Sequence, residues 1–277
     1  MLRRFATAGL LLLGIRRSAA AQGVIVAPHA VYLNHLTRSA SIILYNPGAE
    51  PTEVTISLFF GYPVTDSLGH FTLRVPDSAG TNMPSATAWI EAFPRRMILG
   101  PLQRQTVRLL ARPPENLADG EYWSRIAIAA KAGTVQVKGA DSAGIQVGLT
   151  LEVRTIIPLL YRKGPLQTGI SLTKLAAVRD GDSLDVRAHL QRLGTAAYIG
   201  TAQASLVSER GTTVASLQQP VAIYYDADPV FKLGLPPALP PGRYHVRMTL
   251  TTERTDIAPE LVLRAAPVAD STEVAWP

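Results

Sequence analysis

The residues that could carry out chemistry in this chain are few and scattered. The five histidines are His29, His35, His70, His189 and His245, and none lies at metal-ligand spacing from another histidine or from an acid. Asp226 and Asp228 lie in a turn as calcium ligands do, but two acids in a turn are usually only solvated. The sequence has no cysteine, no Gly-x-Ser-x-Gly elbow and no phosphate-binding glycine loop. We therefore expect no catalytic residue, no metal and no cofactor, and we expect the protein not to be an enzyme.

Binding to another protein has better support than catalysis, because one run of the sequence alternates aliphatic residues with other types. Its aliphatic members are Ile145, Val147, Leu149, Leu151 and Val153. In an extended strand these side chains share one face, and such a face can fill a gap in another protein when the strand joins a sheet edge. The same spacing is typical of a strand that faces its own core, and spacing alone favours that second interpretation.

Alternation of this kind covers most of the chain after residue 22 and predicts an all-β fold. Apolar residues alternate from Val54 to Phe60, from Leu184 to Leu190 and from Tyr244 to Leu250. Turn signals such as Asn46-Pro47-Gly48 and Asp180-Gly181 separate these runs. Their spacing suits antiparallel sheets.

Two short stretches nearly repeat each other: LADGEYW, from Leu117 to Trp123, and LPPGRYH, from Leu239 to His245. Each places a tyrosine, Tyr122 or Tyr244, two residues after a turn glycine and at the start of an alternating run. In immunoglobulin-like sandwiches, a tyrosine at this place sends its hydroxyl back to the backbone of the preceding corner. We therefore expect two immunoglobulin-like β-sandwich domains, each with one structural tyrosine corner.

The chain also shows where the two domains should begin and end. The stretch Arg162-Lys163-Gly164-Pro165 predicts a hinge, because proline stops strand pairing. The first residues carry arginines, an apolar run too short to span a bilayer, and small residues before Gln22. We expect a signal peptide at 1–21, domains at 22–163 and 164–265, and a tail at 266–277. The leader predicts export to the periplasm, with no stable membrane span after its cleavage.

The charge balance gives no reason to expect a nucleic-acid partner. The chain has a formal net charge of +6, but the leader holds four arginines and no acid, so the rest of the chain carries +2. Because there is no cysteine, an exported protein of this sequence must be stabilised by core burial without disulfides.

Three stretches of the first half resemble the periplasmic pilus-assembly chaperones, the PapD-like family. They are VYLNHLTRSASIILYNPG (Val31–Gly48), PRRMILGPLQRQTVRLLARPPENLADGEYWSRIAI (Pro94–Ile128) and GIQVGLTLEVRTIIPLLYR (Gly144–Arg162). The variant Ile157-Pro158-Leu159 is similar to the non-classical branch of that family. The resemblance implies two sandwiches in a boomerang arrangement, and a chaperone that completes the sandwich of a pilus or fimbrial subunit with its own strand. It implies pilus subunits as clients, an outer-membrane usher as a further partner, and a role in fimbria biogenesis.

The chain departs from the family's pattern where the client's terminal carboxylate binds. The family uses an arginine of the first strand and a lysine of the last, but Ala30 and Pro158 stand at these positions. Arg154, Lys163 and His29 lie nearby in the sequence and are the candidates to replace them as a carboxylate anchor.

The resemblance also implies an interdomain salt bridge between Glu121 and Arg162, joined by an acid of the second domain such as Asp226 or Asp228. An alternative hypothesis is a structural or interaction module of the cell envelope that has kept this fold and lost the client-anchoring cleft. A secreted hydrolase with an unrecognised site is a third hypothesis.

Overall fold

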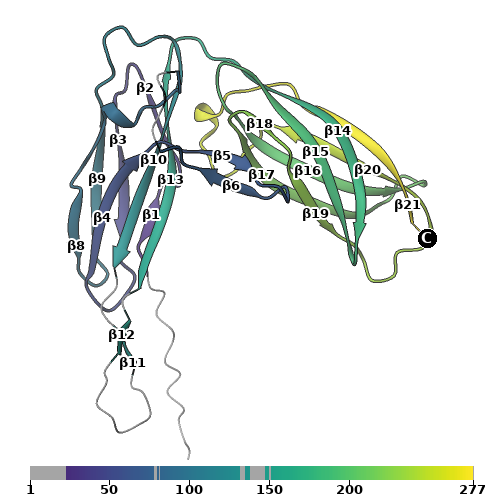
Figure 1. Cartoon of the computed structure of the whole chain (residues 1–277), viewed down its shortest axis with the longest axis horizontal. Coiled ribbons are helices and arrows are strands. Elements are labelled where there is room, and N and C mark those ends of the chain that lie inside the picture. The colour runs from purple at the N-terminus through teal and green to yellow at the C-terminus, as the bar shows by residue number, and fades with distance from the viewer. Residues whose placement is uncertain are drawn as a thin grey trace, which may run out of the picture.

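The computed structural model describes residues 23–77, 80, 82–131, 135–137, 147–149 and 151–276, and for 135–137 and 147–149 it describes the strand path alone. Apart from two short 3₁₀ turns, their regular secondary structure consists of strands, which form two β-sandwiches whose long axes meet at an angle (Figure 1). The prediction of an all-β fold with two sandwiches is confirmed. No helix in the described ranges is long and apolar enough to cross a membrane.

The first sandwich packs two sheets over one core. One sheet has the strand order β1-β3-β9-β7 and the other has the order β2-β13-β10-β4-β8. Their strands are β1 (Ile25–Ala27), β2 (Val31–Asn34), β3 (Ser39–Tyr45), β4 (Thr52–Phe59), β7 (Ile90–Phe93), β8 (Arg96–Leu99), β9 (Arg104–Ala111), β10 (Gly120–Lys131) and β13 (Glu152–Lys163). The N-terminal segment serves both sheets, because β1 pairs with β3 whereas β2 pairs in parallel with β13. Ile42, Leu44, Leu109, Ile126 and Leu159 are fully buried between the sheets.

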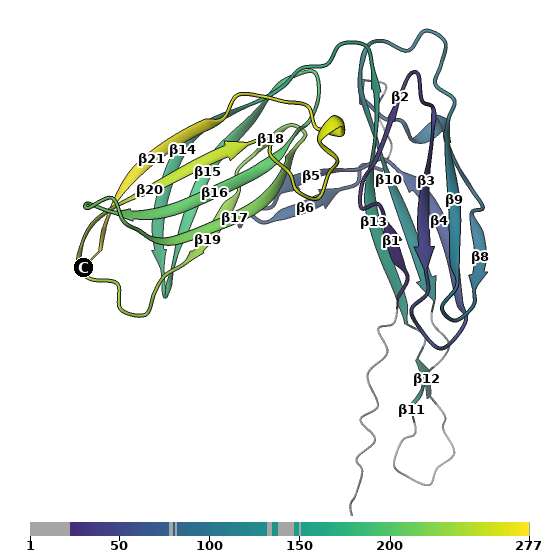
Figure 2. The ribbon, with the colours of Figure 1, turned by 180° about the vertical axis from the view of Figure 1, so that it is seen from behind.

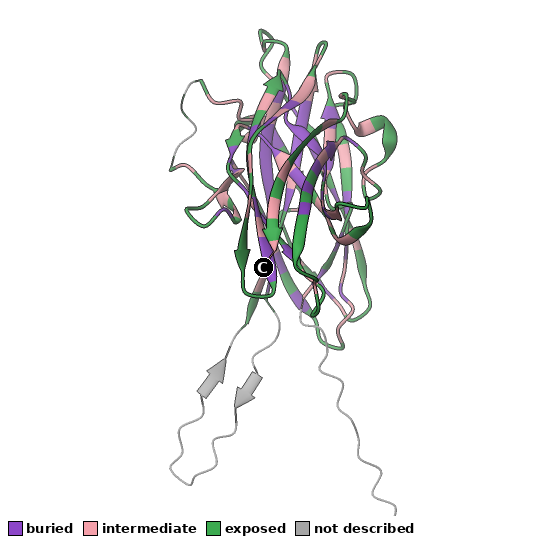
Figure 3. Cartoon of the chain, turned by 90° about the vertical axis from the view of Figure 1, so that its right-hand side faces the viewer, coloured by how far each residue is buried: buried purple, intermediate pink, exposed green. Residues whose placement is uncertain are grey.

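The second sandwich has a separate core. A sheet of β14, β15, β18 and β19 faces a sheet with the order β17-β16-β20-β21. The strands are β14 (Thr168–Asp180), β15 (Ser183–Gly194), β16 (Tyr198–Ser208), β17 (Thr213–Ile223), β18 (Asp226–Ala227), β19 (Val230–Gly234), β20 (Gly242–Thr251) and β21 (Val268–Trp276). The alternating residues of Leu184–Leu190 and Tyr244–Leu250 are buried in this core, as predicted. Figure 3 shows buried segments running along the strands of the sandwiches, whereas the loops are mostly exposed or half-buried.

The prediction of a tail at 266–277 is wrong for Val268–Trp276, which form β21. This strand pairs antiparallel with β20 from Leu250↔Val268 to Gly242↔Trp276. Val268, Val274 and Trp276 pack against the second core, but each is only half-buried. Polar residues fill most of the positions between them, so the apolar alternation of this edge strand is weak in the sequence.

A hairpin from the first half of the chain reaches the second sandwich. Its strands β5 (Tyr62–Thr65) and β6 (Phe71–Arg74) pair with each other and extend toward the second sandwich in both Figure 1 and Figure 2. At the tip, the Val230 N–H donates to the Gly69 carbonyl at 3.0 Å. Gly69 has a φ of +81°, and a Cβ on it would overlap Val230 Cγ2, so this contact requires glycine.

Each tyrosine corner lies at the start of a strand beside the loop that precedes it. Tyr122 Oη donates to the Ala118 carbonyl at 2.9 Å, and Tyr244 Oη donates to the Pro240 carbonyl at 2.8 Å. The remaining elements are the 3₁₀ turns η1 (Thr87–Trp89) and η2 (Pro259–Leu261) and the antiparallel pair β11 (Val135–Val137) and β12 (Val147–Leu149).

Candidate binding site between the two sandwiches

Strand β13 has one edge that is paired along only part of its length. On one side it pairs with β10 from Glu152 to Lys163, whereas on the other side it pairs with β2 only from Leu159 to Arg162. In the part of the chain that the structure describes, no strand pairs with the second side of Glu152–Pro158. An unpaired strand edge of this kind is a template for the addition of another strand.

The hydrogen bonding beside β2 shows which backbone groups point to this open edge. The His35 N–H, just after β2, donates to the Arg162 carbonyl at 3.0 Å. The N–H and C=O of a strand residue point to the same side, and those of its neighbours point to the opposite side, so every second residue before Arg162 faces the open edge. The groups on that edge are the N–H and C=O of Glu152, Arg154 and Ile156 and the C=O of Pro158. A proline is tolerated at residue 158 because the β10 ladder needs no N–H there.

The side chains of β13 alternate between the first core and the space that faces the second sandwich. Ile157 and Leu159 are buried in the first core. Ile156 points to the other face and is 42% exposed, and Leu151, just before β13, is 45% exposed. These aliphatic side chains give the open edge an apolar surface that an added strand would cover.

The structure describes only part of the predicted client-binding strand. Ile145 lies outside the described residues, and Val147 and Leu149 belong to β12, whose side chains are not described. Leu151 is exposed and Val153 is half-buried. The alternative interpretation, that these aliphatic side chains face the core of their own sandwich, is therefore wrong for Leu151.

A cavity of about 580 Å³ lies where the open edge of β13 meets the second sandwich. It is walled by β13, the segment before β2, the β5–β6 hairpin and the second sandwich. Much of the lining is apolar, including Ala30, Leu73, Ile156, Pro158, Ile199 and Ala222. A cavity of this size and character, with a few polar groups, is typical of binding sites.

Two guanidinium groups line this cavity, and the sequence interpretation missed both. Arg125 Nε donates to the Gly61 carbonyl at 2.9 Å, and its guanidinium carbon lies 5.2 Å from the centre of the Tyr224 ring. Among the described residues, no carboxylate pairs with Arg125. Arg254 instead binds Asp256 through two hydrogen bonds, from Nε at 2.7 Å and from Nη2 at 2.6 Å. These bonds hold the pKa of the Asp256 carboxyl below its usual range, so the pair carries no net charge near neutral pH.

Two tyrosines of the cavity wall stay neutral over a wide pH range. Burial raises the pKa of Tyr32 to about 12 and raises the pKa of Tyr224 above its usual value. Because both hydroxyls remain protonated, they add no charge to the cavity.

The three candidates for a carboxylate anchor are not brought together. His29 lines the cavity. Arg154 Nη2 donates to Glu152 Oε1 at 2.8 Å, and Lys163 Nζ, at the far end of β13, donates to the Leu117 carbonyl. Neither Arg154 nor Lys163 lines the cavity, because Arg154 precedes it along β13 and Lys163 lies beyond it.

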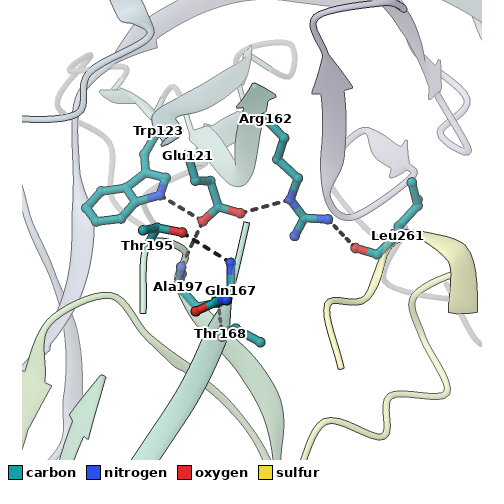
Figure 4. A network of polar contacts seen from close by, with 8 residues as sticks. All are labelled: Glu121, Trp123, Arg162, Gln167, Thr168, Thr195, Ala197 and Leu261. Atoms are coloured by element: carbon teal, nitrogen blue, oxygen red, sulfur yellow. Dashed lines mark hydrogen bonds and ion pairs between the residues drawn. The ribbon is translucent and has the colours of Figure 1, made fainter. Parts of the chain in front are cut away.

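A buried carboxylate connects the two sandwiches (Figure 4). The Glu121 side chain is fully buried, and its Oε2 accepts a hydrogen bond from Arg162 Nε at 2.9 Å. Its Oε1 accepts hydrogen bonds from Trp123 Nε1 and from the Ala197 N–H of the second sandwich, both at 3.0 Å. Arg162 Nη1 donates in turn to the Leu261 carbonyl. Glu121 and Arg162 thus lie in one network that reaches both parts of the chain.

The prediction that an acid of the second domain joins this network is wrong. The second sandwich contributes the Ala197 N–H, and η2 contributes the Leu261 carbonyl, so backbone groups replace the acid. Asp228 instead pairs with His189 Nδ1 at 2.8 Å. In the described ranges, no three His, Cys, Asp or Glu side chains gather as metal ligands.

Aromatic rings pack beside this network and add to the contact between the sandwiches. The Trp123 ring centre lies 4.5 Å from that of Tyr224 and 5.4 Å from that of Tyr225, and Tyr225 also contacts Tyr62 at 4.9 Å. Edge-to-face pairs of this kind stabilise an interface beyond the area they bury. The network and the rings therefore join the two sandwiches whose residues line the cavity.

No family model matches the chain, and no curated protein matches it in sequence. Among solved structures, the YadV chaperone matches with 13% identity and a TM-score of 0.47, over 90% of this chain and 99% of that one. The CsuC–CsuE chaperone–tip subunit complex of Acinetobacter baumannii matches with 12% identity and a TM-score of 0.43, over 82% and 93%. The SafA pilin–SafB chaperone complex of Salmonella enterica matches with 15% identity and a TM-score of 0.41, over 90% and 96%.

Proposed function

We propose that this protein is a periplasmic chaperone that binds pilus or fimbrial subunits by adding its own strand to their incomplete sandwiches. The observation that carries the proposal is the open edge of β13 at Glu152–Pro158, with the exposed aliphatic side chains of Ile156 on it and of Leu151 just before it. The run from Gly144 to Val153, which the sequence predicts to bind the client, continues into this edge and extends the surface that the client covers. The resemblance of the sequence to pilus-assembly chaperones supports the choice of client.

The energetics of this edge suit the capture of a strand. Each added backbone hydrogen bond contributes about 0.5–1.5 kcal/mol, and each aliphatic side chain that becomes fully buried contributes about 1.5–3 kcal/mol. Leu151 and Ile156 are both nearly half exposed and have much surface left to bury. Main-chain bonds give such a complex its affinity, whereas the alternating side chains give it specificity.

Arg125 lines the cavity and is the cation that binds an acidic group of the client, in place of the expected Arg154 and Lys163. It lies directly opposite Pro158 in the β10–β13 ladder, and opposite residues of a ladder share a face. A buried guanidinium without a carboxylate partner favours an anion at its free side. The client's terminal carboxylate has the right chemistry for this position.

Periplasmic location and delivery to an outer-membrane usher complete the proposal. The leader at 1–21 supports export, and it lies outside the described residues. The absence of cysteine agrees with a fold that is stabilised by its two cores.

The test is co-expression with pilus-type subunits. Wild-type protein should give a stable heterodimer, and Leu151→Asp should abolish it, because a carboxylate would have to enter the client's core. Ile98→Asp is the matched control, since Ile98 is 72% exposed on β8, at the other edge of the same sheet. Equal capture of subunits by Leu151→Asp and wild type would overturn the proposal.

A further inference from the structure

We propose that the cavity at the end of the open β13 edge binds a large apolar side chain of the partner strand, and that the cleft selects partners by this residue. The inference rests on the proposed function, because it requires a strand added along β13. It goes further by naming the chemistry of one partner residue and the place where that residue binds.

The open edge has a defined end. Pro158 offers a carbonyl but no N–H, and the next outward-facing residue, Leu160, is already paired with Tyr32 of β2. A strand added along β13 can therefore form its ladder past Glu152, Arg154 and Ile156 and must stop at Pro158. The end of the ladder thus coincides with the cavity, whose wall includes Ile156 and Pro158.

The geometry of a sheet then fixes where the partner's side chains point. Residues directly opposite each other in a ladder project to the same face. Ile156 and Pro158 project into the cavity, so the partner residues beside them project into it too. The partner residues beside Thr155 and Ile157 project to the opposite face, toward the first core.

The lining of the cavity favours an apolar occupant at this point. Ile156 is 42% exposed and lies beside the half-buried Ala30, Leu73 and Pro158 and the buried Ile199. A large apolar side chain would remove these surfaces from water, whereas a small or polar one would leave them wet. Since Asp256 neutralises Arg254, that part of the wall offers no charge to attract a polar side chain. A strand added along the open edge brings the partner residue to the cavity, and the apolar, uncharged part of the wall around Ile156 and Leu73 favours an apolar side chain there. Arg125, which lies opposite Pro158, stays available to the client's carboxylate.

The test uses labelled peptides as strands, with the full-length mature protein. The peptides alternate threonine and valine over about eight residues, a common strand length, and differ only in the last residue, which is phenylalanine or alanine. We expect the phenylalanine peptide to bind about tenfold more tightly by fluorescence anisotropy, a difference of about 1.4 kcal/mol. Thr72→Trp, an exposed change in the cavity wall, should bring the two affinities within about twofold by filling the space.

Thr106→Trp is the matched control, because Thr106 is an exposed strand residue of the first sandwich that does not line the cavity. It should keep the full preference for phenylalanine. Equal binding of the two peptides to the wild type, or an unchanged preference in Thr72→Trp, would overturn this inference and leave the proposed function intact. If neither peptide bound, the open edge would not accept strands, and the proposed function would fall together with the inference.

Discussion

Replacement of Glu121 by glutamine should weaken the connection between the two sandwiches more than any comparable change on the surface. The carboxylate is fully buried and accepts hydrogen bonds from Arg162, Trp123 and the Ala197 N–H. Glutamine replaces one accepting oxygen with an NH₂ group, so at least one of these donors would face another donor. Removing one partner of a buried ion pair costs about 3–5 kcal/mol. The Arg162 side chain keeps 14% exposure, which places the expected loss near the lower end, about 3 kcal/mol.

The assay is urea unfolding followed by tryptophan fluorescence, with the exposed ion pair Glu152–Arg154 as a control. In that pair the side chains are 33% and 61% exposed, so Glu152→Gln should cost less than about 1 kcal/mol. Because Ala197 belongs to the second sandwich, the loss in Glu121→Gln should appear in the transition that separates the sandwiches. Equal losses of unfolding free energy in Glu121→Gln and Glu152→Gln would refute the view that this buried network holds the two sandwiches together.

Three further changes test other parts of the account. Arg154→Pro removes an N–H from the open edge and should weaken client binding at least tenfold with little loss of stability. Thr155→Pro removes a hydrogen bond to β10 and should destabilise the protein by about 3 kcal/mol. If binding and urea assays show that Arg154→Pro destabilises the protein more than Thr155→Pro does, and that Thr155→Pro weakens binding more, the assigned edge is contradicted. Gly69→Ala should lower the free energy of unfolding clearly more than Gly211→Ala does. Both glycines have a positive φ, but only Gly69 packs closely on the second sandwich. Equal losses in urea unfolding would mean that the hairpin contact contributes nothing to stability. Because the pKa of Tyr32 is raised to about 12, only the unfolded state ionises this hydroxyl between pH 10 and about 12. The free energy of unfolding should therefore fall over that pH range, and it should fall less in Tyr32→Phe. The same dependence of unfolding free energy on pH in both proteins would exclude burial of this hydroxyl.

Much of the fold could be predicted because most strands have one buried and one exposed face. Leu184–Leu190 and Tyr244–Leu250 alternate clearly, and each run lies in the second core. Val268–Trp276 gave no such signal, because an edge strand with half-buried residues needs few apolar side chains. The hairpin Tyr62–Arg74 was also missed as an interdomain element, since its contact with Val230 depends on how the sandwiches meet and not on local pattern.

The candidate site was only partly accessible to sequence reasoning. Glu121 and Arg162 could be paired through the family resemblance, but the backbone groups of Ala197 and Leu261 that complete their network carry no side-chain signal. Arg125 did leave a trace, because a charged residue directly precedes the apolar run from Ile126 to Ala130. Its position opposite Pro158 depends on the strand register, which the sequence does not specify.

Amide hydrogen exchange along β13 tests the open edge most directly. In the free protein, the N–H groups of Arg154 and Ile156 should exchange fast and those of Thr155 and Ile157 slowly, because the first pair faces outward and the second pair bonds to β10. On binding of a pilus-type subunit, Arg154 and Ile156 should become protected to the level of their neighbours. Protection of all four amides in the free protein, or unchanged fast exchange of Arg154 and Ile156 in the complex, would contradict the account.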